Sequence, residues 1–291
     1  MRASTREDYE TRVIRTQLYI QRNIETSRLS LEELAEVACF SPYHFHRIFR
    51  AITGESVKEY IRRLRLERAA FQLAQTDRSV LNVALDAGYE THESFTRAFR
   101  RRFGRSPSEH RADRKTAHVA APSTLTATIL EQHGENVVEV KVQELEPMLV
   151  ASVRHTGPYG ECHAAWKTLC GDPAVAQTFG PHTKMLGISY DDPDVTDADK
   201  IRYDACATIL EEQEFGEGVS TQTVAGGRYA VAIHNGSYNG LADCYKYLYG
   251  QWLPDSGYEP AMAPCIEVYL TNPETTPEDE AKTEIRIPLK S

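Results

Sequence analysis

The sequence predicts two domains of different fold class. The first is all-α and contains two helix-turn-helix units, and the second is a duplicated β-α-β-β unit that forms an antiparallel sheet with two helices and a central cleft. Two observations support this division, since each half has its own internal repeat and the charge changes sign between the halves. We expect a first domain over residues 1–115, a linker over 116–136 and a second domain over 137–291.

The charge distribution indicates different partners for the two halves. Residues 1–115 contain 22 Lys and Arg against 16 Asp and Glu, and the remainder contains 11 against 26, so the net charges are +6 and −15. A basic segment can neutralise DNA phosphates, whereas a strongly acidic one suits a cationic ligand or solvent.

The absence of an apolar run of about eighteen residues, together with a charged N-terminus, predicts a cytoplasmic protein without membrane contact. The six cysteines have no metal-ligand spacing, so we expect neither a metal nor a cofactor.

The first half repeats one unit after about fifty residues. LAxxACF from Leu34 matches VAxxAGY from Val83, and FHRIF from Phe45 matches FTRAF from Phe95. Each unit is typical of a helix with small inner residues, a tight turn and a second helix. The predicted N-caps of the second helices are Ser41, followed by proline, and Thr91.

The second helix of each unit has phenylalanines at positions i and i+4, which we expect to face the core. Its polar residues then point outward. These are Tyr43, His46, Arg47 and Arg50 in the first unit, and Glu93, Thr96, Arg97 and Arg100 in the second. A long helix from Val57 would join the units and could place both second helices in successive major grooves, about 34 Å apart. The alternative is a plain helical bundle with solvated arginines.

The second half repeats a different unit. HTGPY from His155 recurs as HNGSY from His234, each after a short apolar run and before a predicted helix. Two strand-like runs follow in both copies, so each repeat reads strand, helix, strand, strand. Two such units can lay both helices over one sheet and leave a cleft on the pseudo-two-fold axis. We expect the two histidines to stabilise turns.

Strand alternation along residues 266–270 separates apolar from polar side chains. We expect Ile266, Val268 and Leu270 to pack beneath the helices, and Glu267 to face the cleft. The repeat partner of Glu267 is Gly187, which leaves space opposite. The candidate ligand-binding residues are Glu267, Tyr269, Tyr159, Trp166, Tyr238 and Gly187. The alternative is a surface glutamate on a solvated sheet face.

Over residues 8–112 the chain resembles the AraC/XylS family of transcription regulators. The resemblance is carried by SLEELA from Ser30 through FHRIF, and by GY at Gly88 through SFTRAF and FGxSP. It implies base-facing positions at Tyr43, His46 and Arg47 in the first unit and at His92, Glu93, Thr96 and Arg97 in the second. We add Ser41 and Arg50 to the expected DNA-binding set. Glu93 departs from the Trp or Gln common in the family, and a glutamate could accept from a cytosine amino group.

Residues 137–291 resemble the GyrI-like effector-binding domain through GIxYxDP from Gly187, RYDAC from Arg202 and IEVYL from Ile266. The resemblance implies an aromatic site in which a glutamate engages cationic or lipophilic compounds. We therefore expect a regulator, not an enzyme, that binds double-stranded DNA and a small-molecule effector. RNA polymerase is a further expected partner, and the chain is expected to act as a monomer or homodimer.

Two alternatives belong to other functional classes. The second domain could hydrolyse electrophilic small molecules, with Glu267 and a nearby tyrosine activating water, although no nucleophile constellation accompanies them. The chain could instead be a sequestering binding protein, which would not need two helix-turn-helix units.

Overall fold

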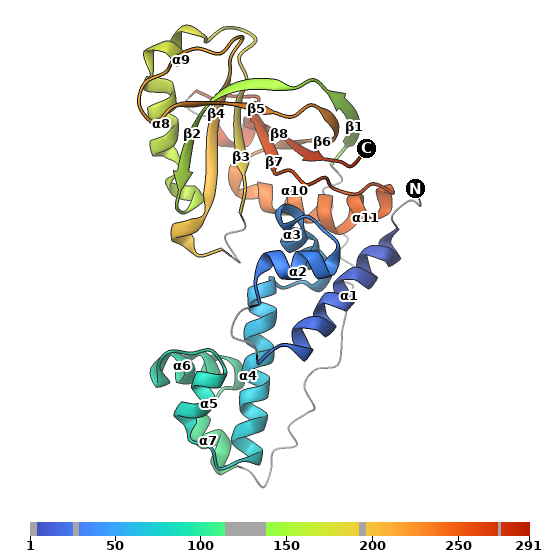
Figure 1. The fold of residues 1–291 in the computed structure, drawn as a ribbon, viewed down its shortest axis with the longest axis vertical. Coiled ribbons are helices and arrows are strands. Elements are labelled where there is room, and N and C mark those ends of the chain that lie inside the picture. The colour runs from blue at the N-terminus through green and yellow to red at the C-terminus, as the bar shows by residue number, and fades with distance from the viewer. Residues whose placement is uncertain (1–4, 26–28, 114–137, 192–195, 273–274) are drawn as a thin grey trace.

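The chain forms an elongated molecule with helices at one end and a curled antiparallel sheet at the other (Figure 1). This computed structural model describes residues 5–25, 29–113, 138–191, 196–272 and 275–291. The predicted linker, residues 116–136, lies outside the described residues. None of the helices within these ranges is both long and apolar enough to cross a membrane.

The first half is all helical, as predicted. Its helices are α1 (Arg6–Arg22), α2 (Leu31–Ala38), α3 (Pro42–Thr53), α4 (Val57–Gln75), α5 (Val80–Asp86), α6 (His92–Phe103) and α7 (Pro107–Ala112). Helices α2 and α3 form one helix-turn-helix unit, and α5 and α6 form the other. The 19 residues of α4 join them and span about 28 Å.

The turns of the two units are equivalent in the backbone. Cys39 after α2 and Gly88 after α5 stand at matching repeat positions, and both have positive φ angles, 55° and 82°. Thr91 caps α6 as predicted, because its side chain accepts a hydrogen bond from the amide of Ser94 at 3.1 Å. Ser41 occupies the N-cap position of α3, but its side chain makes no cap hydrogen bond there.

The phenylalanine pairs face the interior, as their spacing predicts. Phe45 and Phe49 are fully buried in one core, and Phe95 and Phe99 are fully buried in a second core beneath α6. The first core does not end at the first domain. It continues into the second domain through residues such as Leu248 and Ile285.

The second half is one eight-stranded antiparallel sheet with the order β1-β6-β8-β7-β3-β4-β2-β5. Its strands are β1 (Val140–Leu145), β2 (Met148–Thr156), β3 (Met185–Ser189), β4 (Arg202–Thr208), β5 (Ser220–Val224), β6 (Gly227–Asn235), β7 (Cys265–Tyr269) and β8 (Lys282–Pro288). The order is symmetric about the β3–β7 pair, which joins the two repeats. The edge strands are exchanged, because β1 of the first repeat pairs with β6 of the second and β5 pairs with β2.

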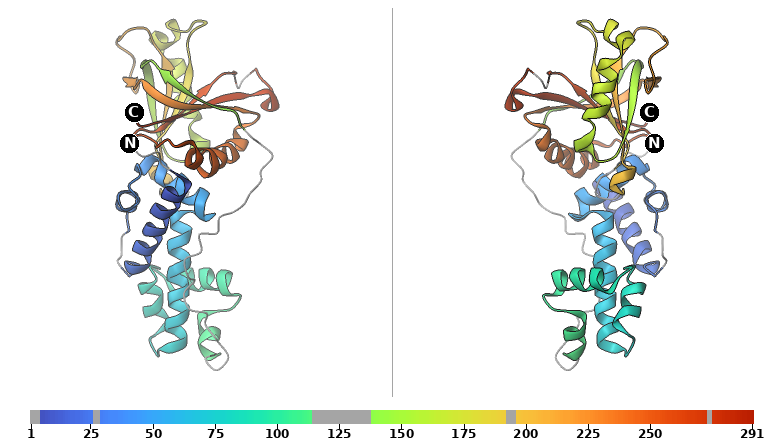
Figure 2. Two further views of the ribbon diagram at one scale, coloured as in Figure 1. Left: turned by 90° about the vertical axis from the view of Figure 1, so that its right-hand side faces the viewer. Right: turned by 90° about the vertical axis from the view of Figure 1, so that its left-hand side faces the viewer.

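The helices of this half are α8 (His163–Gly171), α9 (Pro173–Gln177), α10 (Leu241–Tyr247) and α11 (Leu253–Ser256), with a π-helical turn, Leu248–Trp252, between the last two. Short 3-10 turns cover Tyr159–Glu161, Ala198–Lys200, Tyr238–Gly240 and Glu278–Glu280. Helices α8 and α10 follow equivalent strands of the two repeats, and Figure 2 shows them beside the sheet. His155 and His234 close their turns as predicted, by hydrogen bonds to Pro158 O at 3.0 Å and Ser237 O at 2.9 Å.

One expectation about the faces of β7 is wrong. Helix α10 packs on the face that carries Cys265 and Glu267, whereas Ile266 and Val268 belong to a core cluster on the opposite face. Leu270, expected in the same core, is 48% exposed. Alternation separated the two sets of side chains correctly, but the helices cover the face with the glutamate.

Candidate functional site

Glu267 is held at the centre of the helix-covered face by two phenols. Tyr245 of α10 donates its hydroxyl proton to Oε1 at 2.8 Å, and Tyr269 of β7 donates to Oε2 at 3.3 Å. Burial raises the pKa of both tyrosines well above its usual value, and the charge of Glu267 raises it further. The phenols therefore stay protonated, and the carboxylate accepts from both.

Aromatic rings surround this carboxylate from both repeats. The ring of Tyr269 is 5.6 Å from Trp166 of α8 and 5.7 Å from Tyr238, each in an edge arrangement. Tyr159 lies 6.0 Å from the ring of Tyr203, whose hydroxyl is 2.9 Å from that of Tyr269. The structure thus brings together the glutamate and the four aromatic residues that the sequence singled out.

Gly187 stands directly opposite Glu267 in the β3–β7 register. Its missing side chain leaves space, but tyrosine hydroxyls fill that space. A Cβ at this position would lie 2.6 Å from the hydroxyl of Tyr269 and would also clash with the hydroxyl of Tyr203. The glycine therefore lets the two phenols meet beside the carboxylate.

Sequence reasoning missed Tyr245 and Tyr203 as site residues. Tyr245 was recognisable, because it follows His234 at the same distance as Trp166 follows His155, and the repeat thus aligns the two. Tyr203 offered no comparable signal, since its partner in the second repeat, Thr283, is a fully buried residue of different chemistry.

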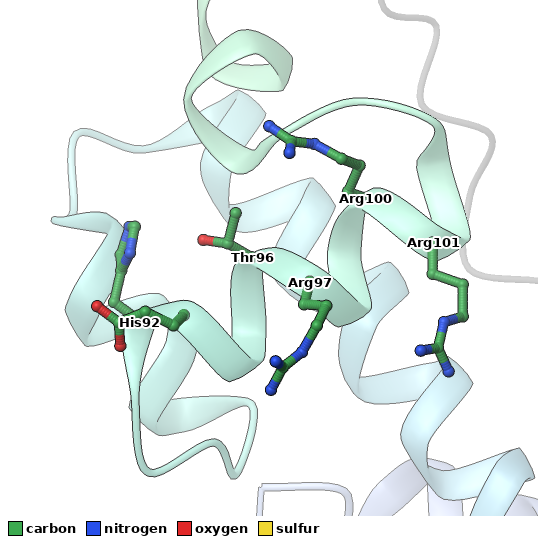
Figure 3. Close-up of a pocket in the computed structure, with 6 residues that line it drawn as sticks. His92, Thr96, Arg97, Arg100 and Arg101 are labelled. Atoms are coloured by element: carbon green, nitrogen blue, oxygen red, sulfur yellow. The ribbon is translucent and has the colours of Figure 1, made fainter.

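Helix α6 presents its predicted residues to solvent. His92, Glu93 and Arg97 are exposed, and Thr96 is half-buried. These residues line a shallow concavity together with Arg100 and Arg101. Figure 3 shows Arg97 and Arg101, one turn apart, pointing away from the helix on the same side.

Helix α3 turns the corresponding face toward the second domain. Arg47 lies with its guanidinium carbon 4.0 Å from the ring centre of Tyr245, and the ring of Tyr43 is 6.4 Å from that of Tyr190. His46 is buried, and burial together with the charge of Arg47 lowers its pKa to about 3.

The two remaining predicted residues of this unit differ in exposure. Ser41 is buried at the start of α3, whereas Arg50 is exposed on its last turn. Of the set predicted for the first unit, Arg50 is therefore the one residue that is exposed, and the others are buried or half-buried.

The comparison with known families follows this division of the chain. The model of the GyrI-like small molecule binding domain matches residues 138–290, more than half of the chain. The chain belongs to the GyrI-like family. A helix-turn-helix domain model matches residues 34–113.

Individual relatives extend the match to the helical half. The regulatory protein SoxS of Salmonella typhimurium is 39% identical over 83 residues, which cover 28% of this chain and 78% of SoxS. The right origin-binding protein of Escherichia coli is 24% identical over 237 residues, covering 78% of this chain and 79% of that protein. The crystal structure of the EcmrR C-terminal domain is 19% identical over 54% of this chain and 99% of that domain, with a TM-score of 0.44. The chain is thus an AraC/XylS-type, DNA-binding transcription regulator with a GyrI-like effector domain.

Polar contacts join the helical half to the GyrI-like domain around α3. Arg12 of α1 pairs with Glu259 at 2.6 Å, and Arg6 pairs with Asp255 at 2.8 Å. The buried Nδ1 of His44 is 2.7 Å from the hydroxyl of Tyr249 in the π-helical turn. The first helix-turn-helix unit and the effector domain are therefore packed together, while the second unit is free of this interface.

Proposed function

We propose that the GyrI-like domain of this regulator binds a lipophilic cation at Glu267, and that the helical half reads duplex DNA with α6 and α3. The observation that carries the effector class is the carboxylate itself. Glu267 is an acceptor fixed by two phenols within an aromatic cluster. A carboxylate with aromatic faces around it favours an organic cation over a neutral compound of equal shape.

The DNA-binding assignment is supported by the surface of α6. Its exposed residues include an arginine that can make two hydrogen bonds to guanine, and basic residues at its end that suit phosphates. For α3 we propose the same role for Tyr43, His46 and Arg47 once that helix is released from the effector domain.

We further propose that the domain binds its effector without transforming it, that the chain acts in the cytoplasm and that it contacts RNA polymerase on DNA. Burial keeps the phenols around Glu267 protonated, so they serve as hydrogen-bond donors and not as bases. Incubation with electrophilic esters should give no faster hydrolysis than buffer, whereas turnover that is lost in Glu267→Gln would support the hydrolase instead.

The effector assignment is tested with a matched pair of compounds. Benzyltrimethylammonium carries a permanent charge, and neopentylbenzene has the same shape without it. Glu267→Gln keeps the shape of the side chain and removes its charge. Calorimetry should show at least a tenfold weaker affinity of Glu267→Gln for the cation, about 1.4 kcal/mol, and little change for the neutral compound. Equal cation affinity in both proteins would remove Glu267 from the site.

A further inference from the structure

Arg47 extends from α3 into the aromatic site of the effector domain. Its guanidinium carbon is 4.0 Å from the ring centre of Tyr245 and 5.7 Å from that of Tyr249. The hydroxyl of the same Tyr245 donates to Oε1 of Glu267 at 2.8 Å. One tyrosine thus contacts a cation of the protein with its ring face and holds the effector carboxylate with its hydroxyl.

This is the interaction that an organic cation would make in the site. A guanidinium keeps its proton at physiological pH, and the electron-rich face of a tyrosine attracts it. Arg47 does not use all of its hydrogen-bond donors in this position, because its Nη1 is buried without a hydrogen-bond partner within the described residues. A ligand that contacted both the tyrosine face and Glu267 would make a more complete set of interactions.

The same contact covers the side of α3 that carries the candidate base readers. Besides Arg47, Tyr43 meets the ring of Tyr190. Further along the helix, Ala51 lies so close to Gly250 that a Cβ on the glycine would be 3.1 Å from the alanine Cβ. A recognition helix must present this side to the major groove. While α3 is packed on the effector domain, therefore, α6 is the recognition helix that remains accessible to DNA.

We propose that Arg47 is an internal competitor of the cationic effector, and that its insertion beside Tyr245 holds α3 away from DNA until the effector displaces it. This inference rests on the proposed function and adds a way in which the effector regulates DNA binding by α3. Binding of the cation and binding of DNA by both helices are then positively coupled, and linkage makes that coupling reciprocal.

The competition is tested by the affinity of benzyltrimethylammonium for the full-length chain. Arg47→Ala should bind the cation at least about fivefold more tightly than the wild type, because the competing guanidinium is gone. Arg22→Ala is the control, since Arg22 is an exposed arginine in the last turn of α1 and has no assigned role in binding. It should change the affinity less than twofold.

The outcomes separate this inference from the function beneath it. If Glu267→Gln weakens binding but Arg47→Ala leaves it unchanged, the internal competitor is refuted and the effector site stands. If Glu267→Gln leaves the cation affinity unchanged, both the effector site at Glu267 and the internal competitor are refuted.

A second measurement uses only the wild-type chain, so it does not depend on the folding of a variant. Small-angle X-ray scattering at saturating benzyltrimethylammonium should show a larger radius of gyration than without it, because α3 separates from the effector domain. An unchanged scattering profile at saturation would overturn the release of α3.

Discussion

At the level of single residues, the candidate effector site depends on four side chains and on a glycine that has none. Glu267 provides the charge, and Tyr245 and Tyr269 fix its two oxygens. Gly187 makes the room in which the hydroxyl of Tyr203 reaches that of Tyr269. The carboxylate is thus positioned before any ligand arrives, which lowers the ordering cost of binding.

The glycine can be tested by adding one methyl group. Gly187→Ala places a Cβ against the hydroxyls of Tyr203 and Tyr269, so the variant should lose about 1–3 kcal/mol of unfolding free energy in urea denaturation. Gly160→Ala is the control, because a Cβ there meets nothing within 4 Å, and it should stay within about 0.5 kcal/mol of the wild type. Adding Tyr203→Phe to Gly187→Ala should recover part of the loss. A Gly187→Ala variant as stable as the wild type would show that the hydroxyls move aside freely.

At the level of elements, the two repeats made most of the fold predictable. Repeated spacing in each half predicted the paired helices and the strand-helix-strand-strand units, because both copies must satisfy the same local packing. Strand alternation likewise placed Glu267 opposite Ile266 and Val268. Alternation cannot tell which face of a sheet its helices cover, so that expectation failed.

For a related reason, sequence patterns could not predict which residues pack against α3. Phe45 and Phe49 fix which side of the helix faces its own core, and Arg47 does point away from them. Periodicity identifies an outward face but not what packs on it. The contact of Arg47 with Tyr245 depends on packing between segments about two hundred residues apart.

Helix α6 permits a direct test of base reading, because its arginines are exposed. On a site selected from a random duplex library, Arg97→Ala should lose about 1–3 kcal/mol of discrimination at one base pair. Arg101→Ala, on the last turn of the same helix, should weaken all sequences alike and reduce the slope of log affinity against log salt by about one. Affinity is measured for each variant at several salt concentrations and on sites with single-base substitutions. These measurements distinguish base reading from phosphate contact. A uniform loss for Arg97→Ala would make it a phosphate contact.

At the level of the whole molecule, the two domains share a core although their charges and repeats differ. Side chains of α1 and α3 pack in one cluster with those of α10 and β8. The polar residues buried at or beside this junction include two histidines of α3, His44 and His46. The acidic effector domain therefore packs against α3 through apolar contacts, neutral histidines and the guanidinium of Arg47.

The two histidines make stability depend on pH. The groups near them include Arg47, the hydroxyl of Tyr249, the thiol of Cys265 and Asp191. Burial, followed by the charge of Arg47, lowers the pKa of both histidines from 6.5 to about 3. The folded chain keeps them neutral, whereas the unfolded chain takes up protons as the pH falls through 6.5. Stability is therefore complete above that value and falls below it.

Between pH 7.5 and 5.5 each histidine should cost about 1.4 kcal/mol of unfolding free energy, or about 3 kcal/mol for the pair. Urea denaturation at the two pH values measures this difference. In His44→Gln the variant loses one titrating group, so whatever its absolute stability, its decrease between the two pH values should be smaller by about 1.4 kcal/mol. An undiminished pH dependence in His44→Gln would show that His44 takes up its proton as readily in the folded chain as in the unfolded chain, and would contradict the prediction.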